Sequence, residues 1–330
     1  MSETLTKKDF KSDQDVKWCP GCGDYAILNV IQGVCADLGY NKDQVAFVSG
    51  IGCSSRFPYY MGTYGFHTIH GRAPAVATGV ATANPDLATW LVTGDGDALS
   101  IGGNHLAHCL RRNLDINILL FNNEIYGLTK GQYSPTSPEG TRTKTSPMGS
   151  VDRPFNPISF ALGCNATFVA RTVDTNLKHM ASVFKAAAAH KGCSFVEIYQ
   201  NCVIFNDGWF EEDMGKKVRD DRTIDLRPGE PLIYGKESDK GLRVEGFQVV
   251  KCEPKDASIW DPTIKSAAAA FQMSTLDYED DLPRPIGIYR AVDGLVFDEA
   301  INAQLDMAVE KKGRGTLQDL IYAGETWEVS

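Results

Sequence analysis

The chain has 330 residues, which is enough for one large domain or two smaller ones around a full hydrophobic core. Its formal net charge of -9 argues against nucleic acid as the main partner. No apolar run reaches the roughly 18 residues of a membrane-spanning helix, and the polar segment 1–16 lacks the apolar centre of a signal peptide. We therefore expect a cytoplasmic protein without membrane contact, in which the nine cysteines are reduced.

Strand-like apolar runs alternate with segments of helical periodicity from residue 17 to about residue 206. Predicted helices cover 24–38, 74–84, 98–112, 157–163 and 175–190, and predicted strands cover 45–49, 88–93, 116–121, 166–170 and 195–200. This alternation predicts an α/β fold with a doubly wound, mostly parallel sheet, in which ligands bind at the carboxyl ends of the strands.

Four cysteines lie in segments that this sheet would bring to one edge. They are a Cys-x-x-Cys pair before the first helix (Cys19 and Cys22), Cys53 after the first strand and Cys202 after the last. Four thiolates fit a [4Fe-4S] cluster or a structural zinc site, and the spacing alone leaves both open beside no metal at all. A thioredoxin-type redox pair is less favoured because no strand precedes Cys19. The remaining cysteines are expected to pack as small apolar side chains: Cys35, Cys109, Cys164, Cys193 and Cys252.

An acidic turn, Gly94-Asp95-Gly96-Asp97, ends the strand 88–93, and the amide pair Asn122-Asn123 ends the strand 116–121. Carboxylate and amide oxygens suit Mg²⁺, which commonly brings phosphate ligands, and glycine lets the backbone approach a diphosphate. The two segments and their spacing resemble the thiamine diphosphate motif. An acidic turn beside a merely polar strand end is the alternative interpretation.

The chain changes character after these elements. The loop from Gly127 to Pro157 is rich in Ser, Thr, Pro and Gly, and we expect it to be functional or covered by a partner. Beyond residue 206 the alternation loosens into a C-terminal extension, with a predicted hairpin around Leu232–Lys251 and a helix from about Glu299 to Lys312. Trp209 and Phe210 are expected to anchor this extension to the main domain.

Several strings in residues 17–206 resemble the beta subunits of 2-oxoacid:ferredoxin oxidoreductases, especially those that use 2-oxoglutarate. They are WCPGCGDYAIL, GIGCSSRFPYY, FHTIHGRAPAVATGVATANPDL, VTGDGDALSIGGNHLAHCLRRN and NILLFNNEIYGLTKGQYSPTS. The resemblance implies a thiamine diphosphate-binding fold of the diphosphate type and favours the cluster over zinc. It divides the chain into a tail (1–16), a thiamine diphosphate-binding domain with an iron-sulfur cluster (17–206) and an extension (207–330) that packs on the main domain and a partner subunit.

The resemblance also implies roles for individual residues. The cluster ligands fall on Cys19, Cys22, Cys53 and Cys202. The Mg²⁺ ligands fall on Asp95, Asn123 and the carbonyl of Ile125, whereas Asn122 is expected to stabilise the turn. The cofactor contacts fall on Ile51, Gly52, Cys53, Ser54, His70, Gly94, Asp95, Gly96, Asp97, Ala98, Asn123, Gly127, Leu128 and Thr129.

The implied reaction is the thiamine-dependent oxidative decarboxylation of 2-oxoglutarate to succinyl-CoA and CO₂, with single electrons passing through the [4Fe-4S] cluster to ferredoxin. Pyruvate or branched-chain 2-oxoacids are alternative substrates. An alpha subunit is expected to supply the pyrimidine-type domain and the catalytic Glu, in a heterodimer or a dimer of heterodimers. A cluster-free thiamine decarboxylase or synthase and a zinc-stabilised interaction protein are the alternative functions.

Two residues near the predicted cofactor loop are candidates for direct roles in catalysis. Arg56 follows Cys53 by three residues and is positioned to pair with a second substrate carboxylate, which would favour 2-oxoglutarate. A surface or interface arginine is the alternative. His70 precedes a predicted helix start and either faces the cofactor or substrate or caps the helix, and the case for His67 is weaker.

Overall fold

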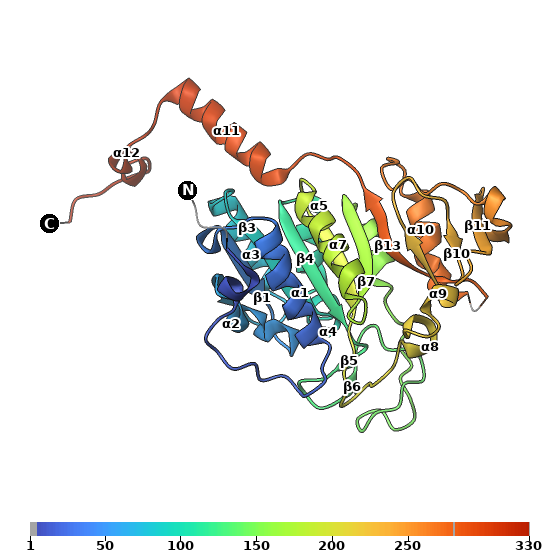
Figure 1. Cartoon of the computed structure of the whole chain (residues 1–330). Coiled ribbons are helices and arrows are strands. Elements are labelled where there is room, and N and C mark those ends of the chain that lie inside the picture. The colour runs from blue at the N-terminus through green and yellow to red at the C-terminus, as the bar shows by residue number, and fades with distance from the viewer. Residues whose placement is uncertain (1–4, 280, 330) are drawn as a thin grey trace.

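The computed structural model describes residues 5–279 and 281–329, and its centre is an eight-stranded sheet in the order β2–β1–β3–β4–β8–β7–β13–β9 (Figure 1). The strands are β1 (Val45–Ser49), β2 (Tyr64–His67), β3 (Ala88–Gly94), β4 (Ile116–Asn122), β7 (Phe168–Val173), β8 (Ser194–Tyr199), β9 (Thr223–Leu226) and β13 (Arg284–Ala291). The first six in spatial order pair in parallel, whereas β13 runs antiparallel to β7 and parallel to β9. The predicted mostly parallel α/β sheet is confirmed.

Helices cover both faces of the sheet, as expected for a doubly wound fold (Figure 1). One face carries α1 (Asp24–Asp37) and α7 (Leu177–Ala189), and the other carries α3 (Ala73–Ala83), α5 (Gly103–Arg112), α6 (Pro157–Gly163) and α10 (Ala268–Thr275). Alternate residues of β4 divide between the two cores: Ile118 and Leu120 face one, and Leu119 and Phe121 face the other. Because both faces are covered, β4 is a continuous buried run rather than an alternating one.

The predicted helix 98–112 was wrong, because the structure has two helices there, α4 (Asp95–Leu99) and α5. The chain turns between them so that the Gly102 amide donates to the Asp97 carbonyl at 3.1 Å. The turn before α3 packs against Gly102. A Cβ on Gly71, whose φ is 65°, would lie 2.4 Å from the Gly102 nitrogen. The close approach of two distant glycines therefore breaks a pattern that looks continuous along the sequence.

The segment after residue 206 contributes two strands, β9 and β13, to the main sheet. It also forms a small sheet of β10 (Ile233–Tyr234), β11 (Lys240–Glu245) and β12 (Gln248–Cys252), which contains the predicted hairpin, and the short helices α8 (Glu211–Met214) and α9 (Arg219–Arg222). Trp209 and Phe210 pack on Tyr199 at the end of β8, so their predicted anchoring role is confirmed.

A buried ionic cluster ties this segment to the sheet. The fully buried guanidinium of Arg171 on β7 donates to Glu197 on β8 at 2.7 Å and to both carboxylate oxygens of Asp277 at 2.7 and 2.8 Å. The ring of Tyr199 also lies 4.9 Å from the guanidinium carbon. Bidentate pairing of this kind satisfies the charge of an arginine that has no access to water.

The chain ends in an arm of α11 (Phe297–Lys312) and α12 (Leu317–Ile321) that projects away from the body (Figure 1). At its root, buried Asp298 accepts a hydrogen bond from the Asp115 amide at 3.1 Å. All side chains described after Asn302 are exposed. Among the helices of residues 5–279 and 281–329, none combines the length and the apolar character needed to cross a bilayer.

Candidate functional site: two adjoining cavities

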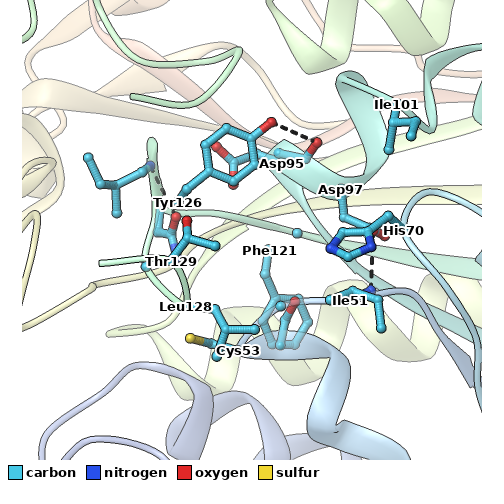
Figure 2. Close-up of a pocket in the computed structure, with 17 residues that line it drawn as sticks. Ile51, Cys53, His70, Asp95, Asp97, Ile101, Phe121, Tyr126, Leu128 and Thr129 are labelled. Carbon is cyan, nitrogen blue, oxygen red and sulfur yellow. Dashed lines mark hydrogen bonds between the residues drawn. The ribbon is translucent and has the colours of Figure 1, made fainter. Parts of the chain in front are cut away.

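A cavity of about 140 Å³ lies at the carboxyl ends of β1, β3 and β4, where the sheet architecture places ligands (Figure 2). All the residues predicted to contact the cofactor line it except Ala98, which is buried in the core. The predicted metal-ligand residue Ile125, at the start of the short hairpin β5 (Ile125–Tyr126) and β6 (Gln132–Tyr133), lines it as well. Three turns that are distant in sequence therefore converge on one space.

Asp97 holds the turns together. Its Oδ1 accepts hydrogen bonds from the backbone amides of Ile51 at 3.2 Å and Gly71 at 2.7 Å, and its Oδ2 accepts one from the Thr93 hydroxyl at 2.8 Å. Gly50 allows this approach, because a Cβ there would lie 1.8 Å from Asp97 Oδ2. The Asp97 carboxylate thus shapes the cavity by fixing its backbone walls.

Asp95 is buried and is oriented by the long loop. Its Oδ2 accepts hydrogen bonds from the hydroxyls of Ser134 at 2.5 Å and Thr136 at 2.7 Å, and no side-chain donor among the described residues reaches Oδ1. Burial raises the pKa of Asp95 to about 6, although the two hydroxyl donors lower it. A divalent cation would stabilise the ionised carboxylate in this place.

The two asparagines after β4 form successive turns. Asn122 Oδ1 accepts from the Glu124 amide and Asn123 Oδ1 accepts from the Ile125 amide, each at 3.2 Å. The Asn122 amide group also donates to Glu197 at 2.8 Å, so this buried residue stabilises the turn as the sequence suggested. Asn123 lines the cavity together with Asp95 and Ile125, and their amide, carboxylate and carbonyl oxygens are hard donors of the kind that Mg²⁺ binds.

Two neighbours of the predicted ligands were missed in the sequence: Glu124 lies between Asn123 and Ile125, and Tyr126 follows Ile125. Burial raises the pKa of Glu124 to about 8, with a further contribution from the charge of Asp95. The Tyr126 hydroxyl donates to the Gly96 carbonyl at 3.3 Å, and its ring fills the space over Gly96, where a Cβ would lie 2.1 Å from the ring (Figure 2). Ser134 and Thr136 were also missed, and the Ser-Pro-Thr-Ser run of the loop was the available signal.

A second cavity of about 210 Å³ adjoins the first and is lined by all four predicted cluster cysteines: Cys19, Cys22, Cys53 and Cys202. Cys53, which Figure 2 shows in the wall of the first cavity, also lines the second. Gly127 lies in the wall that the two cavities share. A Cβ at this position would lie 3.4 Å from Cys202 Sγ and 3.7 Å from Cys53 Sγ. The other five cysteines do not line either cavity.

Two of the four thiols, those of Cys22 and Cys53, lie in a desolvated setting. Burial raises the pKa of Cys53 to about 12, and the charge of Asp24 raises it further. Burial and Asp24 likewise raise the pKa of Cys22 well above its usual range. Thiolates need a positively charged partner to persist in such a place, and bound iron or zinc would supply it.

The candidate catalytic residues lie in different positions. His70 lines the first cavity, on the side away from Leu128 (Figure 2). Arg56 lines the cysteine cavity instead, and its Nη1 donates to the Lys17 carbonyl at 3.1 Å. His67 lines neither cavity: its Nδ1 lies 2.8 Å from the Ser55 carbonyl, which is a packing role.

Comparison with known proteins gives a consistent picture. Residues 50–198 match the family model described as the thiamine pyrophosphate enzyme, C-terminal TPP binding domain. The span runs from the loop after β1 to β8 and therefore includes the walls of the first cavity. This match indicates thiamine diphosphate as a cofactor.

The similar proteins extend the match to nearly the whole chain. The 2-oxoglutarate oxidoreductase subunit KorB of Mycobacterium tuberculosis is 50% identical over 98% of this chain and 88% of its own length. The 2-oxoacid:ferredoxin oxidoreductase 1 subunit beta of Aeropyrum pernix is 44% identical over 63% of this chain and 66% of its own. The solved structure of 2-oxoglutarate:ferredoxin oxidoreductase from Magnetococcus marinus, with 2-oxoglutarate, coenzyme A and succinyl-CoA bound, is similar with a TM-score of 0.78 and 32% identity, covering 97% of this chain and 96% of that one.

Proposed function

Because this chain belongs to the beta subunits of the 2-oxoacid:ferredoxin oxidoreductases, we propose that it oxidises 2-oxoglutarate with thiamine diphosphate, Mg²⁺ and a [4Fe-4S] cluster. The products would be succinyl-CoA, CO₂ and reduced ferredoxin. The observation that carries the proposal is the position of Cys53, whose loop forms a wall of both cavities. Electrons leaving a cofactor in the first cavity would then have a short path to a cluster in the second.

The first cavity suits thiamine diphosphate and Mg²⁺. Asp95, Asn123 and the Ile125 carbonyl would hold the ion, and the lining glycines Gly52 and Gly94 would let the diphosphate approach the backbone closely. Thiamine diphosphate supplies a nucleophilic carbon and an electron sink for decarboxylation. In this arrangement the protein contributes the position of the ion and, through the buried walls, the exclusion of water.

The second cavity suits a cluster better than a zinc ion. Within the described residues, no group of three or more His, Cys, Asp or Glu side chains is close enough together to hold one metal ion. Four cysteines nevertheless surround a single cavity. In a [4Fe-4S] cluster each thiolate binds a different iron, whereas zinc would draw all four sulfurs onto one centre, so a spread arrangement favours the cluster.

An alpha subunit would complete the first cavity and supply the catalytic Glu. Exposed apolar side chains lie on the edge strand β2, in the short helix before it (α2, Phe57–Tyr60) and in the turn that follows it. We call them the edge patch: Tyr59, Tyr64, Phe66 and Ile69. Exposed Ile101 extends this surface to the cavity itself. Apolar patches beside a cavity are typical of protein interfaces.

The other assignments follow from this function. Lys17, Arg56 and Lys130 are the charged side chains that line the cysteine cavity, which suits electron transfer to a negatively charged ferredoxin. Residues 17–206 would form the cofactor domain. The extension 207–330 would complete the sheet and contact the partner through its arm, where Leu317, Leu320 and Trp327 are exposed.

Two measurements test the proposal on the complex with the alpha subunit. The anaerobically purified complex should show the broad visible absorption of an iron-sulfur protein, together with iron and sulfide, and a colourless zinc-containing complex would contradict the cluster. Reduction of ferredoxin with coenzyme A should be fastest with 2-oxoglutarate when pyruvate and 2-oxoisovalerate are compared at equal concentrations. Equal rates would leave the family chemistry but contradict the substrate.

Asp95→Ala tests the metal site separately. The variant should lose Mg²⁺-dependent binding of thiamine diphosphate, because it removes the carboxylate ligand, while its visible spectrum stays that of the wild type. Isothermal titration with the cofactor measures the first effect and absorption the second. Normal cofactor affinity in Asp95→Ala would show that this carboxylate does not hold the ion.

A further inference from the structure

Gln200 lies between the two cavities, immediately after β8, and its side chain contacts both sets of predicted ligands. It is buried, with 1% of its surface exposed, and it lines the cysteine cavity. Its Oε1 accepts a hydrogen bond from the amide group of Asn123 at 2.8 Å. Its Nε2 lies 3.3 Å from Cys22 Sγ and 2.6 Å from the Asn201 carbonyl, and donates to both.

The orientation of this amide is determined by a chain of partners that begins at the backbone. The Ile125 amide donates to Asn123 Oδ1, which fixes the oxygen and nitrogen of the Asn123 side chain. The Asn123 nitrogen can then only donate, so the oxygen of Gln200 must face it. The Gln200 nitrogen is thereby directed at Cys22, and the Asn201 carbonyl accepts its second hydrogen. The backbone amide of Gln200 anchors the residue to the Asn122 carbonyl at 2.9 Å.

We propose that Gln200 is a positioning residue that couples the two cofactor sites: it sets the reduction potential of the cluster through Cys22 and orients Asn123 for the Mg²⁺ of thiamine diphosphate. The inference rests on the proposed function and extends it, because the residue is neither a ligand of the cluster nor a ligand of the ion. The Gln200 side chain donates a hydrogen bond to Cys22, a predicted cluster ligand, and accepts one from Asn123, a predicted Mg²⁺ ligand.

The physical consequences have definite directions. An N–H group directed at a cluster sulfur stabilises the more negative, reduced state, so its loss should lower the reduction potential. Residues that orient a metal ligand through a hydrogen bond typically change metal affinity by about 10–100-fold when they are replaced. Loss of the Gln200 side-chain amide should therefore affect a redox property and a binding property at once, at two different sites.

Gln200→Leu in the reconstituted complex tests both effects, with Gln32→Leu as the matched control. Gln32 is also a buried glutamine, but its amide donates to the Tyr60 carbonyl at 3.2 Å and it lines neither cavity. Redox titration monitored by electron paramagnetic resonance should give a more negative potential for Gln200→Leu, and the wild-type value for Gln32→Leu. Titration with thiamine diphosphate and Mg²⁺ should show about tenfold weaker binding for Gln200→Leu only.

Two further variants separate the roles. Gln200→Glu still accepts from Asn123, so cofactor affinity should return to within about threefold of the wild type. Gln200→Met lacks the N–H group but keeps the side-chain length. If Gln200→Leu loses its cluster, the reduction potential is measured in Gln200→Met instead. Wild-type potential and affinity in Gln200→Leu and Gln200→Met, or equal changes in Gln32→Leu, would overturn the coupling role. A wild-type complex without a cluster or without Mg²⁺-dependent cofactor binding would overturn the proposed function itself.

Discussion

Buried acidic groups lie in or near the two cavities. Burial raises the pKa of Asp24 to about 7 and that of Asp174 to about 6, in addition to the shifts at Asp95, Glu124 and Cys53. Neither oxygen of Asp24 has a hydrogen-bond partner among the described residues. Burial is the largest cause of each shift, and the positive side chains nearby, Arg56 near Cys53 and Arg284 near Glu124, only partly offset it. Bound cations would stabilise the ionised forms of these groups.

Cys202→Ala should lower the iron content of the purified complex and block ferredoxin reduction, because it removes a thiolate from the wall of the second cavity. Cys35→Ala is the matched control, since Cys35 lies on the buried face of α1 and lines neither cavity. Iron and sulfide assays measure the effect. Full iron content in Cys202→Ala would show that Cys202 is not a ligand of the cluster.

Arg56→Ala tests whether this side chain selects the substrate. A guanidinium that pairs with the distal carboxylate of 2-oxoglutarate contributes roughly 1.5–3 kcal/mol, so kcat/KM should fall about tenfold to hundredfold. Pyruvate lacks that carboxylate and is the control substrate, for which the change should be small. An equal loss on both substrates would make Arg56 a residue of the cysteine cavity or the interface, where its contact with Lys17 places it.

At the scale of elements, the hairpin β5–β6 and the loop behind it form the wall that completes the first cavity. Tyr126 on the hairpin covers Gly96 at the start of α4, and Ser134 and Thr136 follow the hairpin directly and hold Asp95. A loop of this length is usually functional in a compact domain. Here it has a definite role, because it carries the hydroxyls that orient a predicted metal ligand.

Gly96→Ala should abolish cofactor binding while the chain still folds, because the new Cβ would lie 2.1 Å from the Tyr126 ring and force it into the cavity. Gly79→Ala is the matched control: Gly79 lies inside α3 with nothing within 4 Å of its added Cβ. Alanine there should stabilise the protein by about 0.5–1 kcal/mol. Calorimetric titration and thermal unfolding measure both variants, and normal cofactor binding in Gly96→Ala would contradict the predicted position of the diphosphate.

At the scale of the whole molecule, the cofactor cavities and the edge patch lie toward one end of the sheet order, at β2, β1, β3, β4 and β8. The opposite end is covered by the extension, through β13, β9 and the buried Arg171 cluster. The end of the sheet that carries the cavities is therefore free to contact a partner. The other end is held in place by the extension. This arrangement also explains why a segment with a loose sequence pattern is integral to the fold.

Phe66→Asp should weaken association with the alpha subunit by about tenfold or more, because a charge would replace an aromatic side chain at the centre of the edge patch. Phe247→Asp is the matched control, since Phe247 lies in the turn between β11 and β12 and is 95% exposed. Co-purification with a tagged alpha subunit and the binding affinity measure the effect. Equal affinities for the two variants would place the interface elsewhere.

The sequence by itself determined the strongly patterned parts of the protein. Strand β1 and helix α6 have the predicted bounds, and the parallel sheet follows from the alternation of elements. Buried runs and caps act within a few residues, so local pattern reveals them. The cysteine spacing and the acidic turn likewise marked which loops carry the chemistry, because ligand types at strand ends are visible in the sequence.

Only the tertiary structure decided what distant segments do to one another. The exposed edge strand β2 and the strands β9 and β13 were not predicted, because their pattern is weak and their pairing partners are remote. The break between α4 and α5 comes from the approach of Gly71 to Gly102. The contact of Gln200 with Asn123 and Cys22 joins residues 77 and 178 positions apart, and no local pattern records a contact of that range.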